Sequence, residues 1–293
     1  MRMTHLSRRE FAALAASAAA APFVFDQKSS AATITAQDVI DRIKTHIGIE
    51  WKADSVDGVK AGELSTIVKG VVTTSMATLA VLQQAVKAGA NMVIGGQPTF
   101  YARTDGRNRP GDPVFAAKNE FIARHNIVVF RLSEHWRLRQ PDPFSNGMAA
   151  ALAWTKYQSS ADPRRFDVAP VKLESLAATV KKRLHLRGGI RVVGDPRITV
   201  RRVGVLAGTT PIQASLNMLP NVDVILAGEI REWESVEYAR DQVFSGENKG
   251  LIVVGRVVSE EPGMNICATW LKTLVPEVPV RHVAAGDPYW RPA

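Results

Sequence analysis

Residues 87–101 read KAGANMVIGGQPTFY, and this stretch indicates which class of fold the chain adopts. A helix predicted over residues 76–88 ends at Gly89, a residue that suits the left-handed turn after a helix. The apolar run MVI at 92–94 then predicts a short buried strand. GGQP at 95–98 ends this strand, because glycine and proline interrupt regular structure. Ligands bind beyond the carboxyl ends of strands in open α/β folds, so this loop is the first candidate wall of a site.

The same pattern returns later in the chain. GANMVIGGQ at 89–97 and NVDVILAGE at 221–229 each combine a helix end, an apolar strand and a glycine-containing loop. The alternation of helices with short apolar strands favours α/β layers, and the repeat favours two similar α/β lobes. We predict a first lobe at 33–160, a connecting segment at 161–200 and a second lobe at 201–293, after a separate segment at 1–32.

The spacing of apolar residues places the remaining elements. Helices are predicted at 36–47, 113–125, 146–154, 173–184 and 211–219, and strands at 66–73, 127–132, 203–206, 222–226, 251–254 and 278–283. Residues 51–62 and 133–142 are predicted to be irregular. Ser259 is predicted to cap a last helix whose first turn carries Glu260, Glu261 and Pro262.

Composition places the chain among ordinary globular proteins, with 46% hydrophobic and 22% charged residues in 293. The single cysteine, Cys267, excludes an internal disulfide framework and is predicted to be a buried, unreactive thiol. The net charge is +9, but the basic residues are scattered and are not interleaved with aromatic residues. We therefore expect no nucleic-acid partner, and the charge indicates either an affinity for small anions or, alternatively, only general solubility.

The first 32 residues have the features of an export signal. SRREF at 7–11 matches the twin-arginine pattern, an alanine-rich apolar region runs from 11 to 25, and SAA at 30–32 suits cleavage before Thr33. The apolar region is too short to span a bilayer, so the mature protein is expected in the periplasm or outside the cell, without a membrane anchor. Residues 1–32 hold four basic and two acidic residues, so their removal lowers the net charge from +9 to +7. The alternative is a mildly amphipathic helix with a chance arginine pair.

Four motifs occur in an order that resembles a known family. They are the apolar strand and two-residue slot before Pro98, a histidine-containing loop at 133–142, AGE at 227–229 followed by WE at 233–234, and GRVVSE at 255–260. In this order, over residues 39–283, they resemble the Ngg-one-interacting-factor-three-like family, also called dinuclear-metal-centre hexameric proteins or GTP cyclohydrolase I type 2 homologues. The resemblance implies two α/β lobes with mixed sheets flanked by helices, a cleft between the lobes that holds two divalent metal ions, and a homohexamer.

The resemblance also implies a set of metal ligands, and this chain departs from it. The slot before the proline carries histidine in the family, and here it is Gly96-Gln97. The histidine of the late motif is replaced by Arg256, whereas Glu260 matches. In the middle loop His135 and Asp142 are the candidates for a surviving ligand. Glycine has no side chain, an amide is a weak donor and a guanidinium repels metal ions, so we expect no dinuclear centre here.

The functional prediction is an exported homologue of a metal-dependent, hydrolase-like family whose metal site is degenerate. We expect non-catalytic binding of a small anion or a structural role, with Arg256 and Arg137 as candidate anion ligands and Arg256–Glu260 as a candidate ion pair. The alternative is a hydrolase of nucleotide-like or cyclic substrates that uses one metal held by His135, Asp142 and Glu260.

Two further groups remain open at this point. Glu229, Glu232 and Glu234 are either acid/base groups or a solvated helix start. GTT at 208–210 is either an anion site at a helix N-terminus or a plain turn.

Overall fold

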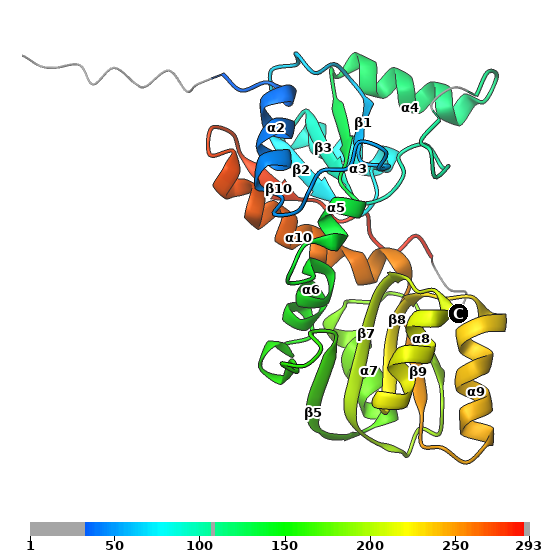
Figure 1. Cartoon of the computed structure of the whole chain (residues 1–293). Helices are drawn as coiled ribbons and strands as arrows, with labels where there is room; N and C mark the ends of the chain where they lie inside the picture. The colour runs from blue at the N-terminus through cyan, green and yellow to red at the C-terminus, as the bar shows by residue number, and fades with distance from the viewer. Residues whose placement is uncertain (1–32, 107–108, 290–293) are drawn as a thin grey trace, which may run out of the picture. The chain divides into compact units, whose positions relative to one another are not determined.

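The computed structural model describes residues 33–106 and 109–289 (Figure 1). The predicted export signal at 1–32 lies outside these residues. The chain from Thr33 onward forms one compact unit that contains two five-stranded sheets flanked by helices. The sequence-based prediction of an α/β fold with mixed sheets is therefore confirmed. No helix in the described ranges is both long and apolar enough to cross a bilayer.

The first sheet is built around the strand that begins at Met92. Its order is β1 (Gly58–Ala61), β4 (Val128–Arg131), β3 (Met92–Gly95), β2 (Val71–Thr74) and β10 (Val280–His282). Only β1 is antiparallel to its neighbour. The three central strands of this sheet, β2, β3 and β4, are buried on both faces, as parallel strands covered by helices are expected to be.

Helices cover both faces of this first sheet. Alternate strand residues such as Val71 and Ile94 face α2 (Ala36–His46), whereas Val72 and Val93 face α3 (Leu79–Lys87) and α4 (Pro113–Arg124). The predicted helix at 36–47 is confirmed with its cap, because the Thr35 side chain accepts a hydrogen bond from the Asp38 N–H.

The second sheet has the order β5 (Arg165–Lys172), β7 (Thr199–Thr209), β8 (Val224–Glu229), β9 (Gly250–Val253) and β6 (Arg191–Val193). β7, β8 and β9 are parallel, and the two edge strands are antiparallel to their neighbours. The core on one face includes side chains of α6 (Pro143–Ala151) and α7 (Leu173–Arg183), and the core on the other includes α8 (Ile212–Met218) and α9 (Glu237–Phe244).

The two sheets correspond in four of their five strands, and they differ at the last edge, where β10 is parallel to β2 but β5 is antiparallel to β7. Read from the β1 edge of one and the β6 edge of the other, the orders are β1-β4-β3-β2-β10 and β6-β9-β8-β7-β5. In both sheets the first edge strand is antiparallel, the next three are parallel, and the strand of the predicted repeat, β3 or β8, lies in the middle. The short sequence repeat therefore reflects a repeated sheet topology.

The boundaries of the two lobes differ from those predicted from the sequence. Residues 161–200, predicted to connect the lobes, supply β5, α7 and β6, and both of these strands belong to the second sheet. In the opposite direction, β10 lies within 201–293 but pairs with β2 in the first sheet. These edge strands are polar or very short, so their pairing is decided by neighbours that are distant in the sequence.

The longest described helix, α10 (Arg256–Leu274), corrects the predicted helix start at Ser259. The helix begins one turn earlier, after Gly255, whose φ of 97° allows the sharp turn that leaves β9. Pro262 consequently lies inside the helix. α10 contacts α6, β2, β10, β7 and β8, so it packs against strands of both sheets. Cys267 in this helix is buried as predicted, and burial raises the pKa of its thiol.

Residues 133–142 are also more regular than predicted. They contain the short helix α5 (Glu134–Leu138), and Asp142 caps α6. The predicted irregular segment 51–62 contributes the edge strand β1. The candidate residues of the middle loop are therefore held on helix termini rather than on a free loop.

Candidate functional site

The loop after β3 meets α10 at a buried hydrogen bond between side chains. The Gln97 amide donates from Nε2 to Oε2 of Glu260 over 2.7 Å. Gln97 is 4% exposed and Glu260 1% exposed, so this carboxyl group is removed from solvent. The slot predicted from the sequence and the retained carboxylate are thus brought together, with an amide in the position where the family resemblance implies an imidazole.

Two guanidinium groups approach the same carboxyl group. Arg137, from α5, donates from Nη2 to Glu260 Oε1 over 2.6 Å, and its guanidinium stacks 4.3 Å from the ring centre of Phe144. Arg256 lies further away, with Nε 3.8 Å from Glu260 Oε2 and Nη1 3.5 Å from Glu229 Oε2. The predicted Arg256–Glu260 pairing is therefore present, but the shorter contact belongs to Arg137.

Gly208 provides the space in which Arg137 and Glu260 pair. A Cβ atom at Gly208 would lie 2.7 Å from Arg137 Nη2 and closer still to Glu260 Oε1. Its φ of +80° also disfavours any other residue. Gly208 donates its N–H to the Ser259 hydroxyl over 2.9 Å, so β7 and α10 are tied together beside the ion pair. GTT at 208–210 is thus an extension of β7 and a turn, while α8 begins only at Ile212.

Burial and the neighbouring donors shift the pKa of Glu260 in opposite directions. Burial raises the pKa of its carboxyl group above the ordinary value, and Arg137, Arg256 and the Gln97 hydrogen bond oppose this rise. Both carboxyl oxygens already accept a hydrogen bond from a protein donor. The group can therefore serve as the buried partner of these donors, and it offers little free coordination to a metal ion.

His135 is engaged elsewhere. Its Nε2 accepts a hydrogen bond from the Lys52 N–H at 2.9 Å, and Nδ1 lies 2.8 Å from Asp57 Oδ2. Because Nε2 is the acceptor, the neutral ring carries its proton on Nδ1 and donates it to Asp57. The ring is buried and stacks on Trp51 with 3.8 Å between centroids. Both nitrogens of His135 thus have a partner in the protein.

Asp142 is also committed to local structure. One carboxylate oxygen accepts the Phe144 N–H at 3.0 Å and the other accepts the Ser145 hydroxyl at 2.6 Å, which caps α6. Within the described ranges, no group of three or more His, Cys, Asp or Glu side chains lies close enough together to hold a metal ion. The amide, the hydrogen-bonded carboxylate and the two guanidinium groups do not suit the dinuclear centre that the family resemblance implies.

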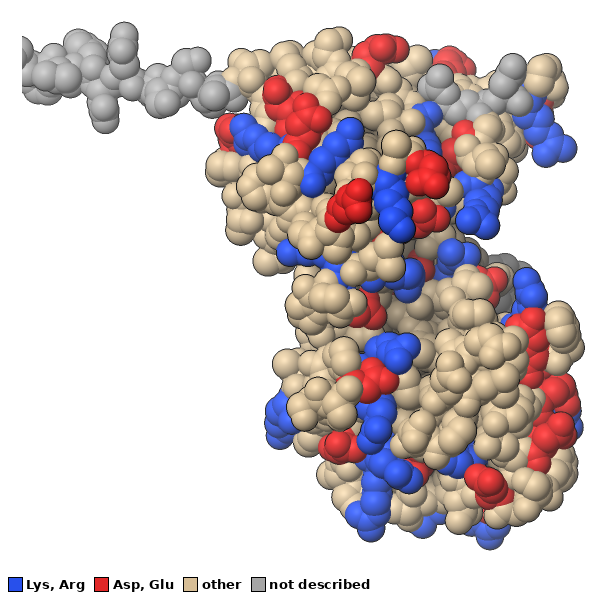
Figure 2. Space-filling model, viewed as in Figure 1, with Lys and Arg blue, Asp and Glu red and all other residues tan. Residues whose placement is uncertain are grey.

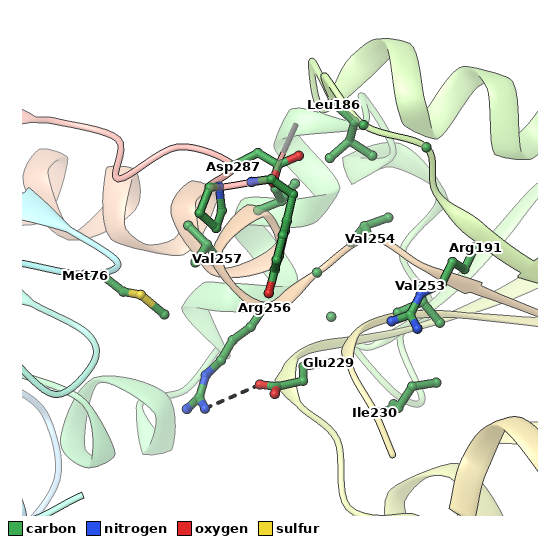
Figure 3. Close-up of a pocket in the computed structure, with 17 residues that line it drawn as sticks. Met76, Leu186, Arg191, Glu229, Ile230, Val253, Val254, Arg256, Val257 and Asp287 are labelled. Atoms are coloured by element: carbon green, nitrogen blue, oxygen red, sulfur yellow. Dashed lines mark hydrogen bonds and ion pairs between the residues drawn. The ribbon is translucent and has the colours of Figure 1, made fainter. Parts of the chain in front are cut away.

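A cavity of about 720 Å³ opens next to Arg256, at the carboxyl ends of β8 and β9 (Figure 3). It is lined by the end of β8 and the residue after it (228–230), by the end of β9 and the start of α10 (253–258), by residues 287–289, and by Met76, Leu186, Gly188, Gly189 and Arg191. A second hollow of about 480 Å³ shares Glu229, Ile230 and Arg256 with it. Figure 3 shows the Arg256 side chain reaching toward Glu229 at one side of the cavity.

The other acidic candidates lie in ion pairs. Glu232 accepts from Arg191 at 2.7 Å and Glu234 from Arg231 at 2.8 Å. Glu232, whose side chain is 74% exposed, fits the solvated interpretation, whereas the Glu234 side chain is only 10% exposed and does not. Figure 2 likewise shows basic and acidic side chains interspersed over the face in view, without a continuous basic surface. Sequence reasoning missed the roles of Asp57, Arg191 and the terminal Asp287–Tyr289 segment, because no local pattern marks residues that meet only in the folded chain.

Comparison with known proteins adds the family. The model of the family described as Duf34/NIF3 (NGG1p interacting factor 3) matches residues 34–286. No curated protein matches the chain.

Solved structures share the fold at low sequence identity. Hypothetical protein SA1388 of Staphylococcus aureus is 15% identical with a TM-score of 0.68, and the match covers 88% of this chain and 99% of that one. A Bacillus cereus protein related to NIF3 is 14% identical with a TM-score of 0.67, covering 88% and 99%. Reduced HcgD from Methanocaldococcus jannaschii is 16% identical with a TM-score of 0.62, covering 85% and 98%.

Proposed function

The chain belongs to the Duf34/NIF3 (NGG1p interacting factor 3) family, and from that premise we propose that it binds a small anion, without catalysis and without a dinuclear metal centre. The observation that carries this proposal is the state of Glu260, the family carboxylate that the sequence retains. Its two oxygens accept hydrogen bonds from Gln97 and Arg137, and Arg256 lies beside it. The position implied for cations therefore holds cationic side chains of the protein itself.

Electrostatics favours an anion over a metal ion at this position. A guanidinium a few ångströms from a divalent cation costs several kcal/mol at an effective dielectric constant of about 20. Arg256 is only partly engaged, since its ion-pair distances are 3.5 and 3.8 Å and its buried Nε has no hydrogen-bond partner among the described residues. The Arg256 side chain is 36% exposed, so an oxyanion can accept hydrogen bonds from the accessible part of its guanidinium.

The hydrolase alternative lacks support of this kind. It requires His135, Asp142 and Glu260 to share one metal ion, yet the polar atoms of each side chain bond to different protein groups. Freeing them would break the stack on Trp51, the cap of α6 and the ion pair with Arg137. Anion binding requires none of these rearrangements.

The decisive experiment measures metal content and anion binding on the same purified chain. After exposure to Zn²⁺ and Mn²⁺ and removal of free ions, we expect less than about 0.2 metal ions per chain, because the ligand number is insufficient. Inorganic phosphate should bind in calorimetric titration, and Arg256→Gln should weaken this binding. The matched control is Arg197→Gln, an exposed arginine paired with Asp195. One or two tightly bound ions per wild-type chain would overturn the proposal.

A gain-of-ligand variant tests the geometry. The double substitution Gln97→His and Arg256→His replaces an amide and a cation with two imidazoles next to Glu260. We expect its metal content to rise toward one ion per chain. An unchanged metal content in a folded double variant would show that these positions do not converge on one site.

We also propose that the protein is exported by the twin-arginine route and forms a hexamer. The SRREF pattern at 7–11 supports export, and the family resemblance supports the assembly. N-terminal sequencing of the periplasmic fraction should find Thr33 at the start of the mature chain. Light scattering coupled to size-exclusion chromatography should find six copies, and a monomer would contradict the assembly.

A further inference from the structure

The cavity beside Arg256 has the size and position of a small-molecule site. Its volume of about 720 Å³ lies within the range of roughly 300–1,000 Å³ that is typical of ligand pockets. It opens at the carboxyl ends of the parallel strands β8 and β9, where ligands of α/β sheets bind. A single phosphate ion would fill only a small part of it, so the space calls for a larger molecule.

Much of the wall is apolar. Ile230, Val253 and Val254 are each 8% exposed or less, and Val257 and Leu186 line the same space (Figure 3). Replacing the water next to these side chains with an apolar body is favourable, because it removes apolar surface from water. About half of the wall is polar, so the cavity suits a ligand that combines an apolar body with polar groups.

The charged groups of the cavity have both signs. Arg256 supplies the loosely paired guanidinium, while Glu229 and Asp287 place two carboxylates in the lining. These carboxylates make a dianion such as hydrogen phosphate bind more weakly than a monoanion, whereas a single carboxylate can bind Arg256 and leave Glu229 as an acceptor. A ligand with one carboxylate and one adjacent hydrogen-bond donor satisfies both groups.

The C-terminal segment forms one wall, and α10 anchors it. The Ala285 N–H donates to Glu261 Oε1 over 2.6 Å, and His282 Nε2 lies 2.9 Å from Glu261 Oε2. Ser75 donates its hydroxyl to the same Glu261 Oε1 over 2.7 Å. These contacts hold the chain after β10 against α10, so that Asp287, Pro288 and Tyr289 reach the cavity. Tyr289 is 75% exposed and offers an aromatic face without a ring partner among the described residues.

From these observations we infer that the cavity binds an organic monocarboxylate with an apolar, preferably aromatic, body and a hydroxyl or amino group next to the carboxylate. The carboxylate pairs with Arg256, the neighbouring donor bonds to Glu229, and the apolar body lies between Val253, Val257 and Tyr289. This inference rests on the proposed function, because it assigns a chemical class to the anion bound there.

The probe is 3-phenyllactate, titrated calorimetrically into the full chain beside phenylacetate, phenethylamine and inorganic phosphate. Phenyllactate should bind at least tenfold more tightly than phosphate and severalfold more tightly than phenylacetate, which lacks the donor. Phenethylamine, which lacks the carboxylate, should not bind. Arg256→Gln should weaken phenyllactate about tenfold, whereas Arg197→Gln should leave its affinity unchanged.

A second variant separates the apolar contact from the charge. Tyr289→Ala should weaken phenyllactate severalfold and leave phosphate binding unchanged, because it removes only the aromatic wall. Tyr289 is exposed, so this substitution leaves the fold intact. If phosphate binds as well as phenyllactate, the proposed function stands and this inference is wrong. If neither binds, both are wrong, and tighter binding of phenethylamine would also overturn the carboxylate assignment.

Discussion

At the scale of single residues, Arg137 stabilises a carboxyl group that the fold has removed from water. Burial raises the pKa of Glu260, and Arg137 is the strongest of the charges that oppose this. A raised pKa in the folded chain means that Glu260 contributes stability at low pH, and that this contribution is lost as the pH rises through the folded pKa. Arg137→Met removes the cation and raises the pKa of Glu260 further, so more stability is lost as the pH rises.

We therefore expect Arg137→Met to lower the free energy of unfolding by about 2 kcal/mol at pH 8 and by clearly less at pH 5. This value is at the low end for a broken buried pair because Arg137 is 41% exposed. Urea denaturation at both pH values measures it. Adding Glu260→Gln should recover most of the loss and remove its pH dependence. An equal loss at both pH values would show that Arg137 acts through packing on Phe144 alone.

At the scale of elements, the sequence predicted the central strands and failed at helix starts and sheet edges. β3, β4 and β8 are continuous apolar runs, so their signal is local. The start of α10 was missed because Ser259, Glu260 and Pro262 resemble a first helical turn, whereas Gly255 makes the actual turn. α5 was missed because its cap is distant in the sequence. Asp57 accepts hydrogen bonds from the N–H groups of residues 133–135.

The crossing of α6 and α10 supplies a prediction at this scale. A Cβ atom at Gly147 would lie 2.5 Å from the Gly263 nitrogen, so the two helices meet at their glycines. Alanine is favoured over glycine in a helix by about 1 kcal/mol, but the clash acts in the opposite direction. We expect Gly147→Ala to destabilise the chain by about 2 kcal/mol in chemical denaturation.

Gly106→Ala is the control for this crossing, since a Cβ atom there meets nothing within 4 Å. It should change the free energy of unfolding by less than about 0.5 kcal/mol. If Gly147→Ala instead stabilised the chain, helix propensity would outweigh packing and the close approach of the helices would be refuted.

At the scale of the whole molecule, the sequence predicted the repeat and the residues that meet around Glu260. The strand at 92–94 and its partner at 224–226 are alike because each forms the centre of its own sheet. Gln97, Arg137 and Arg256 were singled out and do surround Glu260. The local engagement of His135 and Asp142, and the cavity wall formed by 287–289, depend on contacts between distant parts of the chain. No periodicity within a segment can report such contacts.

The position of α10 determines how the molecule should unfold. Met264, Cys267 and Leu271 belong to the same core as the first sheet, and the helix also contacts β7 and β8 of the second sheet. Unfolding of either sheet would therefore expose part of α10, and the other sheet would lose a helix that is held in place on both sides. We expect residues 33–289 to unfold in one transition, with a calorimetric enthalpy equal to the van't Hoff enthalpy.

The buried and partly buried tryptophans of the described residues are divided between the two cores, so fluorescence can follow one core without the other. Trp136 lies in the core of the first sheet and Trp154 in the core of the second. Trp51 and Trp270 also pack against the first core, so Trp154→Phe removes the tryptophan of the second core and leaves three reporters of the first, to be compared with the unsubstituted chain. We expect the thermal unfolding midpoints from fluorescence to coincide at a fixed protein concentration, after subtraction of the shift that a substitution itself causes in calorimetry. Separated midpoints would mean that the contacts of α10 with the second sheet are too weak to couple the two halves.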